Sequence, residues 1–101
     1  MELRHLRYFV AVAEAGSLTV AAQRMYTSQP SLSRQIRDLE DEVGAQLLTR
    51  RARGIDLTPA GRAFLEHARV VLSQVEAAAE AARRVANPAK PSFAMGFLTS
   101  D

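Results

Sequence analysis

The chain has 101 residues, of which 48% are apolar and 24% charged, and its formal net charge is +2. These values are typical of one folded globular domain and exclude a chain that is disordered throughout. The absence of cysteine excludes a disulfide scaffold and any thiolate metal site.

The sequence contains neither a membrane-spanning run nor a secretion signal. No stretch approaches the ~18 consecutive apolar residues of a membrane span. Residues 1–7 alternate charged and apolar side chains, so they lack the apolar core of a signal peptide. We therefore expect a cytoplasmic protein.

All but one of the 13 basic residues are arginine. The planar guanidinium group binds phosphates and base edges through two hydrogen bonds at once. GC-rich coding also favours arginine over lysine, so this bias fits nucleic-acid binding without establishing it.

Apolar residues spaced three and four apart predict two helices in the first 25 residues. The first helix ends near Gly16, and Ser17 is a good N-cap for a second, short helix. The expected stripe of the first helix is Leu3, Leu6, Phe9, Val10 and Ala13, and that of the second is Leu18, Ala21, Ala22 and Met25.

A third helix is expected from Gln29 to a C-terminal glycine, Gly44, after a turn at residues 26–28. Pro30 lies in its first turn, where the missing N–H costs nothing. Two helices joined by so short a turn form a helix-turn-helix unit. The expected inward stripe of the third helix is Leu32, Ile36, Leu39 and Val43.

Residues 47–50 and 55–58 flank the basic segment 51–54, and the second run alternates apolar and polar side chains with the period of a strand. This pattern predicts a two-stranded hairpin with a basic tip, or wing.

Thr58 and Pro59 form a strong helix start, and no helix breaker follows until Asn87-Pro88. A helix over 59–86 would be about 42 Å long, more than the body of so small a domain can cover. Its apolar residues follow a four-three spacing that favours a partner helix. The expected dimerisation seam is Phe64, Ala68, Val71, Val75, Ala78, Ala82 and Val85.

We divide the chain into a domain over residues 1–58, a linker and dimerisation helix over 59–87, and a hinge with one strand over 88–101. A lone strand is not stable in water. We therefore expect residues 88–101 to begin a second domain of a longer protein; in a complete protein the same tail would be disordered.

The outer face of the third helix is cationic at its start and acidic at its end. In a helix-turn-helix, the start of the second helix enters the major groove of DNA. There Arg34 can bind a guanine and Gln29 an adenine, while the later acids, which phosphates repel, should lie where the helix leaves the groove. An ordinary surface helix with an Arg34–Asp38 pair is the alternative. The outer face comprises Pro30, Arg34, Arg37 and Asp41, with Ser31 and Ser33 on its flanks, and the acids are Asp38, Glu40, Asp41 and Glu42.

In the wing, Arg50, Arg51 and Arg53 can simply keep the turn in water. Beside a DNA-binding helix, however, Arg53 next to Gly54 is well placed to enter a narrow minor groove, where the negative potential is greatest.

The segments FVAVAEAGSLTVAA, SQPSLSRQIRDLE and LTPAG, in this order and spacing, resemble the DNA-binding end of LysR-type transcriptional regulators over residues 1–61. The helix after LTPAG is similar to the linker helix of that family, and FAMGFLTS resembles the first strand of its effector-binding domain. The opening MELRHLRYFVAVAE resembles members that control the breakdown of aromatic acids.

The resemblance implies a mainly α fold, a winged helix-turn-helix of three helices and a two-stranded wing, followed by a long dimerisation helix. It implies a homodimer on a dyad-symmetric promoter site, a tetramer in the intact protein, and an effector bound only by a C-terminal domain that this chain lacks. From the absence of cysteine and of metal-ligand spacing we expect no metal or cofactor. Tyr26, where a smaller aliphatic residue is commoner, is a departure that concerns local packing. The resemblance places Gln29, Pro30, Ser33 and Arg34 in the major groove, Arg53 in the minor groove, and Ser31 and Arg50 on the DNA backbone; Arg37 completes our set of DNA-binding candidates.

Two other classes of function compete with this interpretation. A winged helix used for protein contact, without specific DNA binding, is the alternative to a DNA-binding module. An enzyme is not expected, because no nucleophile elbow, phosphate loop, metal-ligand spacing or carboxylate pair accompanies His5 or His67.

Overall fold

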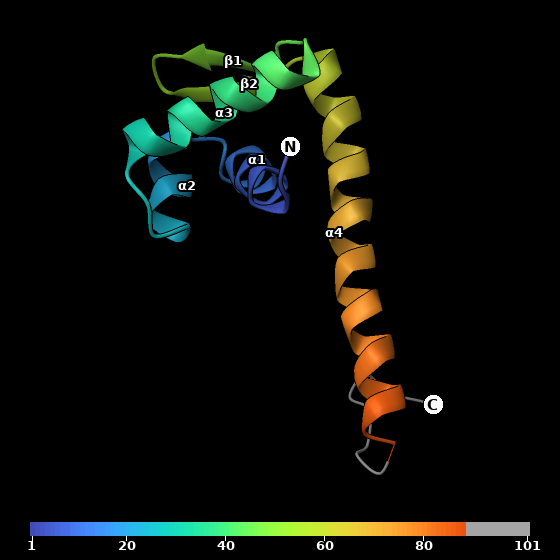
Figure 1. Cartoon of the computed structure of the whole chain (residues 1–101). Helices are drawn as coiled ribbons and strands as arrows, with labels where there is room; N and C mark the ends of the chain where they lie inside the picture. The colour runs from blue at the N-terminus through green and yellow to red at the C-terminus, as the bar shows by residue number, and fades with distance from the viewer. Residues whose placement is uncertain (89–101) are drawn as a thin grey trace.

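The structure is a computed structural model that describes residues 1–88. This part of the chain contains four helices and one two-stranded sheet (Figure 1). The elements are α1 (Leu3–Ala15), α2 (Leu18–Arg24), α3 (Gln29–Val43), β1 (Leu48–Arg51), β2 (Gly54–Leu57) and α4 (Pro59–Ala86). The predicted fold class is confirmed, whereas the strand expected near the C-terminus lies outside the described residues.

Local capping chemistry sets the helix ends. The hydroxyl oxygens of Ser17, Ser28 and Thr58 each accept the backbone N–H three residues further on, at 3.2, 3.2 and 2.9 Å. Such a cap satisfies one of the free donors at a helix start. Gly16 and Gly44 follow α1 and α3 with φ of 67° and 80°, a left-handed backbone that glycine adopts without steric cost.

The core lies where α1, α2 and α3 meet each other and the first part of α4. From α1 and α2 it takes Phe9, Val12 and Ala21, none of which has exposed surface. From α3 it takes Leu32 and Leu39, which are also fully buried. Because these side chains come from three helices, each helix is held by the others rather than by its own propensity.

Three details of the predicted packing are wrong. On α1 the buried stripe runs through Val12, whereas Leu3 is 39% exposed, because α1 packs on its neighbours later along its length. On α3 the stripe ends at Leu39, and Val43 in the last turn is 38% exposed. Tyr26 is 97% exposed, so it has almost no packing to alter.

The wing is an antiparallel pair in which Leu48 faces Leu57 and Arg51 faces Gly54. It is tied to the turn after α1, where the Ile55 N–H donates to the Gly16 carbonyl at 3.1 Å. A Cβ at Gly54 would lie 2.5 Å from that same carbonyl oxygen, so the close approach requires glycine.

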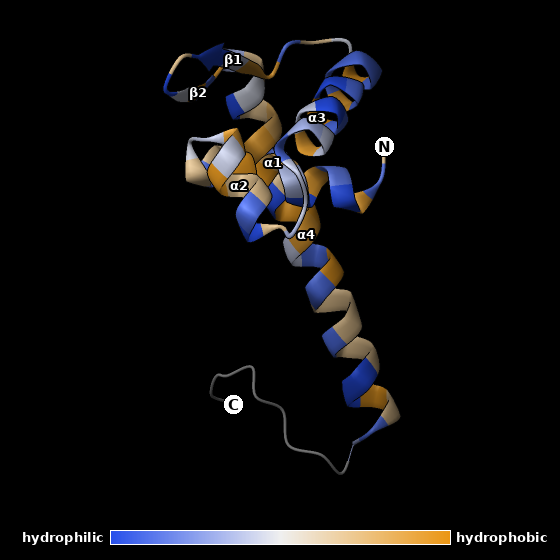
Figure 2. Ribbon diagram, turned by 90° about the vertical axis from the view of Figure 1, so that its left-hand side faces the viewer, coloured by the Kyte–Doolittle hydropathy of each residue, from blue (hydrophilic) through white to orange (hydrophobic). Residues whose placement is uncertain are grey.

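The first part of α4 belongs to the domain, and the remainder extends away from it (Figure 1). The Phe64 ring meets the Phe9 ring edge-on at a centroid distance of 5.2 Å, and Leu65 and Ala68 are buried. Beyond these residues, hydrophobic side chains still recur along the helix (Figure 2). Within residues 1–88, no helix combines the length and apolar character needed to cross a bilayer.

Candidate nucleic-acid interface

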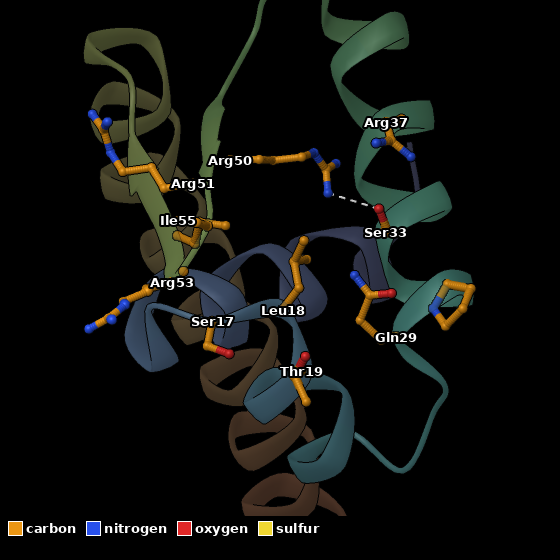
Figure 3. Close-up of a pocket in the computed structure, with 13 residues that line it drawn as sticks. Ser17, Leu18, Thr19, Gln29, Ser33, Arg37, Arg50, Arg51, Arg53 and Ile55 are labelled. Carbon is orange, nitrogen blue, oxygen red and sulfur yellow. Dashed lines mark hydrogen bonds between the residues drawn. The ribbon is translucent and has the colours of Figure 1, made fainter.

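A pocket opens between the start of α3, the wing and the start of α2 (Figure 3). It brings together most of the DNA-binding candidates from two parts of the chain, although Ser31 and Arg34 lie outside it. The lining residues are Ser17, Leu18, Thr19, Gln29, Pro30, Ser33, Arg37, Arg50, Arg51, Ala52, Arg53, Gly54 and Ile55.

The start of α3 presents the polar and cationic surface that the sequence predicts. Pro30, Arg34 and Arg37 are exposed, and Gln29 and Ser31 are half-buried at the same end of the helix. The peptide dipoles of the helix add a partial positive charge at this end to that of the arginines, although the Ser28 cap satisfies one of the backbone donors there. This surface suits a polyanion.

Ser33 does not lie on the open face of α3. It is 6% exposed, and its Oγ accepts a hydrogen bond from Nη1 of Arg50 at 2.8 Å (Figure 3). The flank position expected from the helical periodicity is therefore turned toward the wing.

Arg50 is a half-buried cation in the wall of the pocket. Burial, and then the neighbouring Arg37 guanidinium, lower the pKa of Arg50, while Glu40 acts in the opposite direction. A guanidinium still keeps its proton at neutral pH. Its Nη2 is buried and has no hydrogen-bond partner within the described part of the chain, so the site holds an unsatisfied donor as well as a charge.

Glu40 is the residue of this region that sequence analysis missed. Its Oε2 accepts the backbone N–H groups of Leu47 at 2.7 Å and Leu48 at 3.0 Å, so it fixes the entry into β1. In the sequence it stands among three other acids, and nothing local distinguishes it from Asp41, which is exposed. Its position next to the buried Leu39 is the one available signal, and that signal is weak.

The two arginines near the wing tip differ in their surroundings. Arg51 forms an ion pair through Nε with Asp56 on the other strand. Arg53 lies in the turn between the strands and is exposed, directed away from α3 in Figure 3. Arg53 makes no ion pair with the described part of the chain, so its guanidinium can meet a ligand.

Comparison with known proteins identifies the family. Residues 3–62 match the model of the bacterial regulatory helix-turn-helix proteins of the lysR family. The chain belongs to the LysR family. It is 52% identical over 100 residues to the Hca operon transcriptional activator HcaR of Escherichia coli, and 47% identical over 100 residues to the regulator BenM of Acinetobacter baylyi. Each alignment covers 99% of this chain and 33% of the relative, so the chain spans about a third of their length.

Solved LysR-family structures share its architecture. The structure of the CbnR DNA-binding domain in complex with DNA matches with a TM-score of 0.83 and 49% identity, over 85% of this chain and 99% of that one. The BenM DNA-binding domain bound to catB site 1 DNA matches with a TM-score of 0.82 and 50% identity, over 85% and 97% of the two chains.

In this LysR-family chain, the seven seam residues of α4 fall into two groups. Phe64 packs on Phe9, and Ala68 is 2% exposed, so the chain itself uses these two positions. The others lie beyond the domain, with Val71 41% and Val85 83% exposed. The apolar residues of α4 that the domain leaves uncovered therefore start later than the heptad pattern indicated. They are Val71, Val75, Ala78, Ala82 and Val85.

The two histidines lie on different helices, His5 on α1 and His67 on α4. Nδ1 of His5 accepts the Glu2 backbone N–H at 3.1 Å, which completes a capping box at the start of α1. His67 is exposed on α4. Within residues 1–88, no three histidine or acidic side chains come together as a metal site would require.

Proposed function

We propose that the chain is the sequence-specific DNA-binding part of a bacterial LysR-type transcriptional regulator and that it binds a dyad-symmetric promoter site as a homodimer. The observation that carries this proposal is the convergence of Gln29 and Arg37 from α3 with Arg50 from the wing around one pocket, which Arg51 and Arg53 also line. Similarity to domains solved with DNA supports it further. A module for protein contact alone is less well supported, because its partner would have to cover a surface lined by the arginines Arg37, Arg50, Arg51 and Arg53.

The proposed contacts divide the interface into bases and phosphates. Arg34 and Gln29, with Pro30 beside them, meet base edges in the major groove, and Arg53 enters the minor groove. Ser31, Arg37 and Arg50 contact the backbone. A phosphate oxygen would give the buried Nη2 of Arg50 the acceptor that it lacks in the described chain.

Ser33, which we also expect to lie at the DNA, acts from the wall of the pocket. Its Oγ already accepts the Arg50 hydrogen bond, so its own O–H proton is the part that remains to be donated to a phosphate or a base.

We base the proposed oligomer and domain organisation on the same family. Residues 1–58 bind DNA, residues 59–87 dimerise through the exposed apolar residues of α4, and residues 88–101 lead into an effector-binding domain. In the intact protein we expect a tetramer acting in the cytoplasm, with a small-molecule effector bound only by that further domain. The relatives are transcriptional regulators, and we propose that this chain likewise has no enzymatic activity.

Selection of bound duplexes from random DNA tests the proposal. We expect the chain to enrich two inverted half-sites at a fixed spacing, because a two-fold dimer presents two identical binding surfaces. The affinity should fall steeply with salt through the release of counterions from phosphates. Recovery of sequences without a shared motif would favour the protein-contact alternative.

A further inference from the structure

Hydrogen bonds join the wing to α3 at two separate points. At one point Nη1 of Arg50 donates to Oγ of Ser33 at 2.8 Å. At the other, the N–H groups of Leu47 and Leu48 donate to Oε2 of Glu40 at 2.7 and 3.0 Å. The wing therefore meets the proposed DNA-binding helix through β1 and the residue before it.

Because the two contacts lie apart on α3, they restrain the angle between β1 and α3 as well as the distance between them. Ser33 and Glu40 are seven residues apart, so they lie on the same face of α3, about 10 Å from each other along its axis. On β1 the two contacts come from positions two residues apart, one through the backbone N–H of Leu48 and the other through the side chain of Arg50. A single contact would let the strand pivot about it, whereas two separated contacts hold its direction relative to the helix.

Other hydrogen bonds connect the wing to elements other than α3. The Ile55 N–H donates to the Gly16 carbonyl in the turn after α1, and the Thr58 N–H donates to the Leu47 carbonyl at the start of α4. Neither bond involves α3. Leu47 and Leu48 also pack in the core beside Leu32, Ile36 and Leu39 of α3, and within residues 1–88 the hydrogen bonds accepted by Ser33 and Glu40 add directional contacts between the wing and this helix.

We infer that Glu40 is a positioning residue that, with the Ser33–Arg50 contact, holds the wing at a fixed angle to α3 and so sets where Arg53 meets DNA. This inference rests on the proposed DNA-binding function. Glu40 touches no DNA in this scheme, and its negative charge taken alone opposes binding. It acts because a carboxylate that accepts two amide N–H groups makes strong, charge-assisted hydrogen bonds.

A double-mutant cycle tests the inference, with a duplex carrying the site that the unmodified chain selects from random DNA. The affinity loss caused by Arg53→Ala is measured in the unmodified chain and in Glu40→Ala. We expect the loss to be about threefold or more smaller in Glu40→Ala, because a loosely held wing places Arg53 poorly. The affinity loss caused by Arg34→Ala should be the same in both backgrounds, because Arg34 lies on α3 and not on the wing. A lower folded fraction of Glu40→Ala would leave both affinity losses unchanged, so it cannot imitate the expected result.

Asp41→Ala is the matched control. It also removes one negative charge from α3, but the Asp41 side chain is exposed and no hydrogen bond joins it to the wing within the described residues. In that background the Arg53→Ala loss should be unchanged. Amide hydrogen exchange adds a measurement without DNA: Leu47 and Leu48 should exchange faster in Glu40→Ala while the amides of α3 keep their protection.

Equal Arg53→Ala losses in the unmodified chain and in Glu40→Ala would overturn the inference. So would an Arg53→Ala variant that binds as well as the unmodified chain, yet the proposed function would then still stand on the Arg34→Ala loss. If Glu40→Ala does not fold, Glu40→Gln replaces it in the cycle; its neutral amide makes weaker bonds, so a smaller reduction is expected, and no reduction counts against the inference.

Discussion

In α3 the apolar stripe is covered by the rest of the domain, whereas in α4 much of it is left in water. Leu32, Ile36 and Leu39 are at most 1% exposed. On α4, Val71 and Val85 are 41% and 83% exposed although they belong to an equally regular apolar pattern. The same kind of apolar pattern is therefore buried within the chain in α3 and left largely exposed in the far part of α4.

The outward faces of the two helices explain what each one leaves to a partner. The start of α3 turns Arg34 and Arg37 outward, so its partner must be anionic and polar. The far part of α4 turns outward valine and alanine at heptad spacing, and such a surface is covered by another helix of the same kind. In the proposed function a second copy of this chain supplies that helix, and DNA binds the surface at the start of α3.

A glutamate placed on the apolar stripe of each helix should affect α3 and α4 very differently. The larger effect is expected from Leu39→Glu on α3. Leu39 is fully buried, so an acid there would be both unpaired and dehydrated. We expect the loss to exceed about 4 kcal/mol and the chain to be largely unfolded. Circular dichroism and urea unfolding measure it. A cooperative transition near that of the unmodified chain would show that the α3 stripe is less essential than its burial indicates.

Val71→Glu is the matched change on α4. Because Val71 is 41% exposed in the single chain, the fold should persist, but the dimer should weaken by about 3 kcal/mol, since each of two copies loses a buried valine. Sedimentation over a range of concentrations should show a monomer with unchanged helicity. A dimer as tight as that of the unmodified chain would place the interface elsewhere.

Arg34→Ala probes the outward face of α3 rather than its stripe. We expect no change in fold or dimerisation, a loss of about 1–3 kcal/mol in binding to the selected site, and weaker discrimination at the base that Arg34 meets. Binding to single-base variants of the site measures this. Arg24→Ala, which removes an exposed arginine from α2, is the control and should leave base discrimination intact.

The ends of the elements were predictable because their causes are local. Ser17, Gly44 and the Thr58-Pro59 pair are each sufficient to start or end a helix, and the structure places the ends there. Periodicity also predicted most of the core. It failed at Val12 and Val43, because a stripe says which residues share a face but not how far along the helix the neighbours reach.

The parts of the site that depend on distant segments were not predictable. The Arg50–Ser33 bond joins residues 17 positions apart, and Glu40 binds amides 7 and 8 positions away. Both exist because the wing folds back along α3, which no local pattern encodes. The heptad spacing of α4 similarly could not reveal that Ala68 packs within the chain. The roles of the individual DNA-binding candidates stay predictions.

The smallest effect is expected at Tyr26, in the turn that leads into α3. Its φ of 56° is left-handed, which costs a side chain other than glycine or asparagine about 1 kcal/mol, and the ring is 97% exposed, so replacing it loses almost no packing. Tyr26→Asn should therefore raise the free energy of unfolding by about 0.5–1 kcal/mol, measured in urea, whereas Tyr26→Ala keeps the strained Cβ and should gain nothing. Equal gains would instead point to the exposed ring. Since neither the α3 stripe nor the α4 surface is altered, dimerisation should not change in either variant.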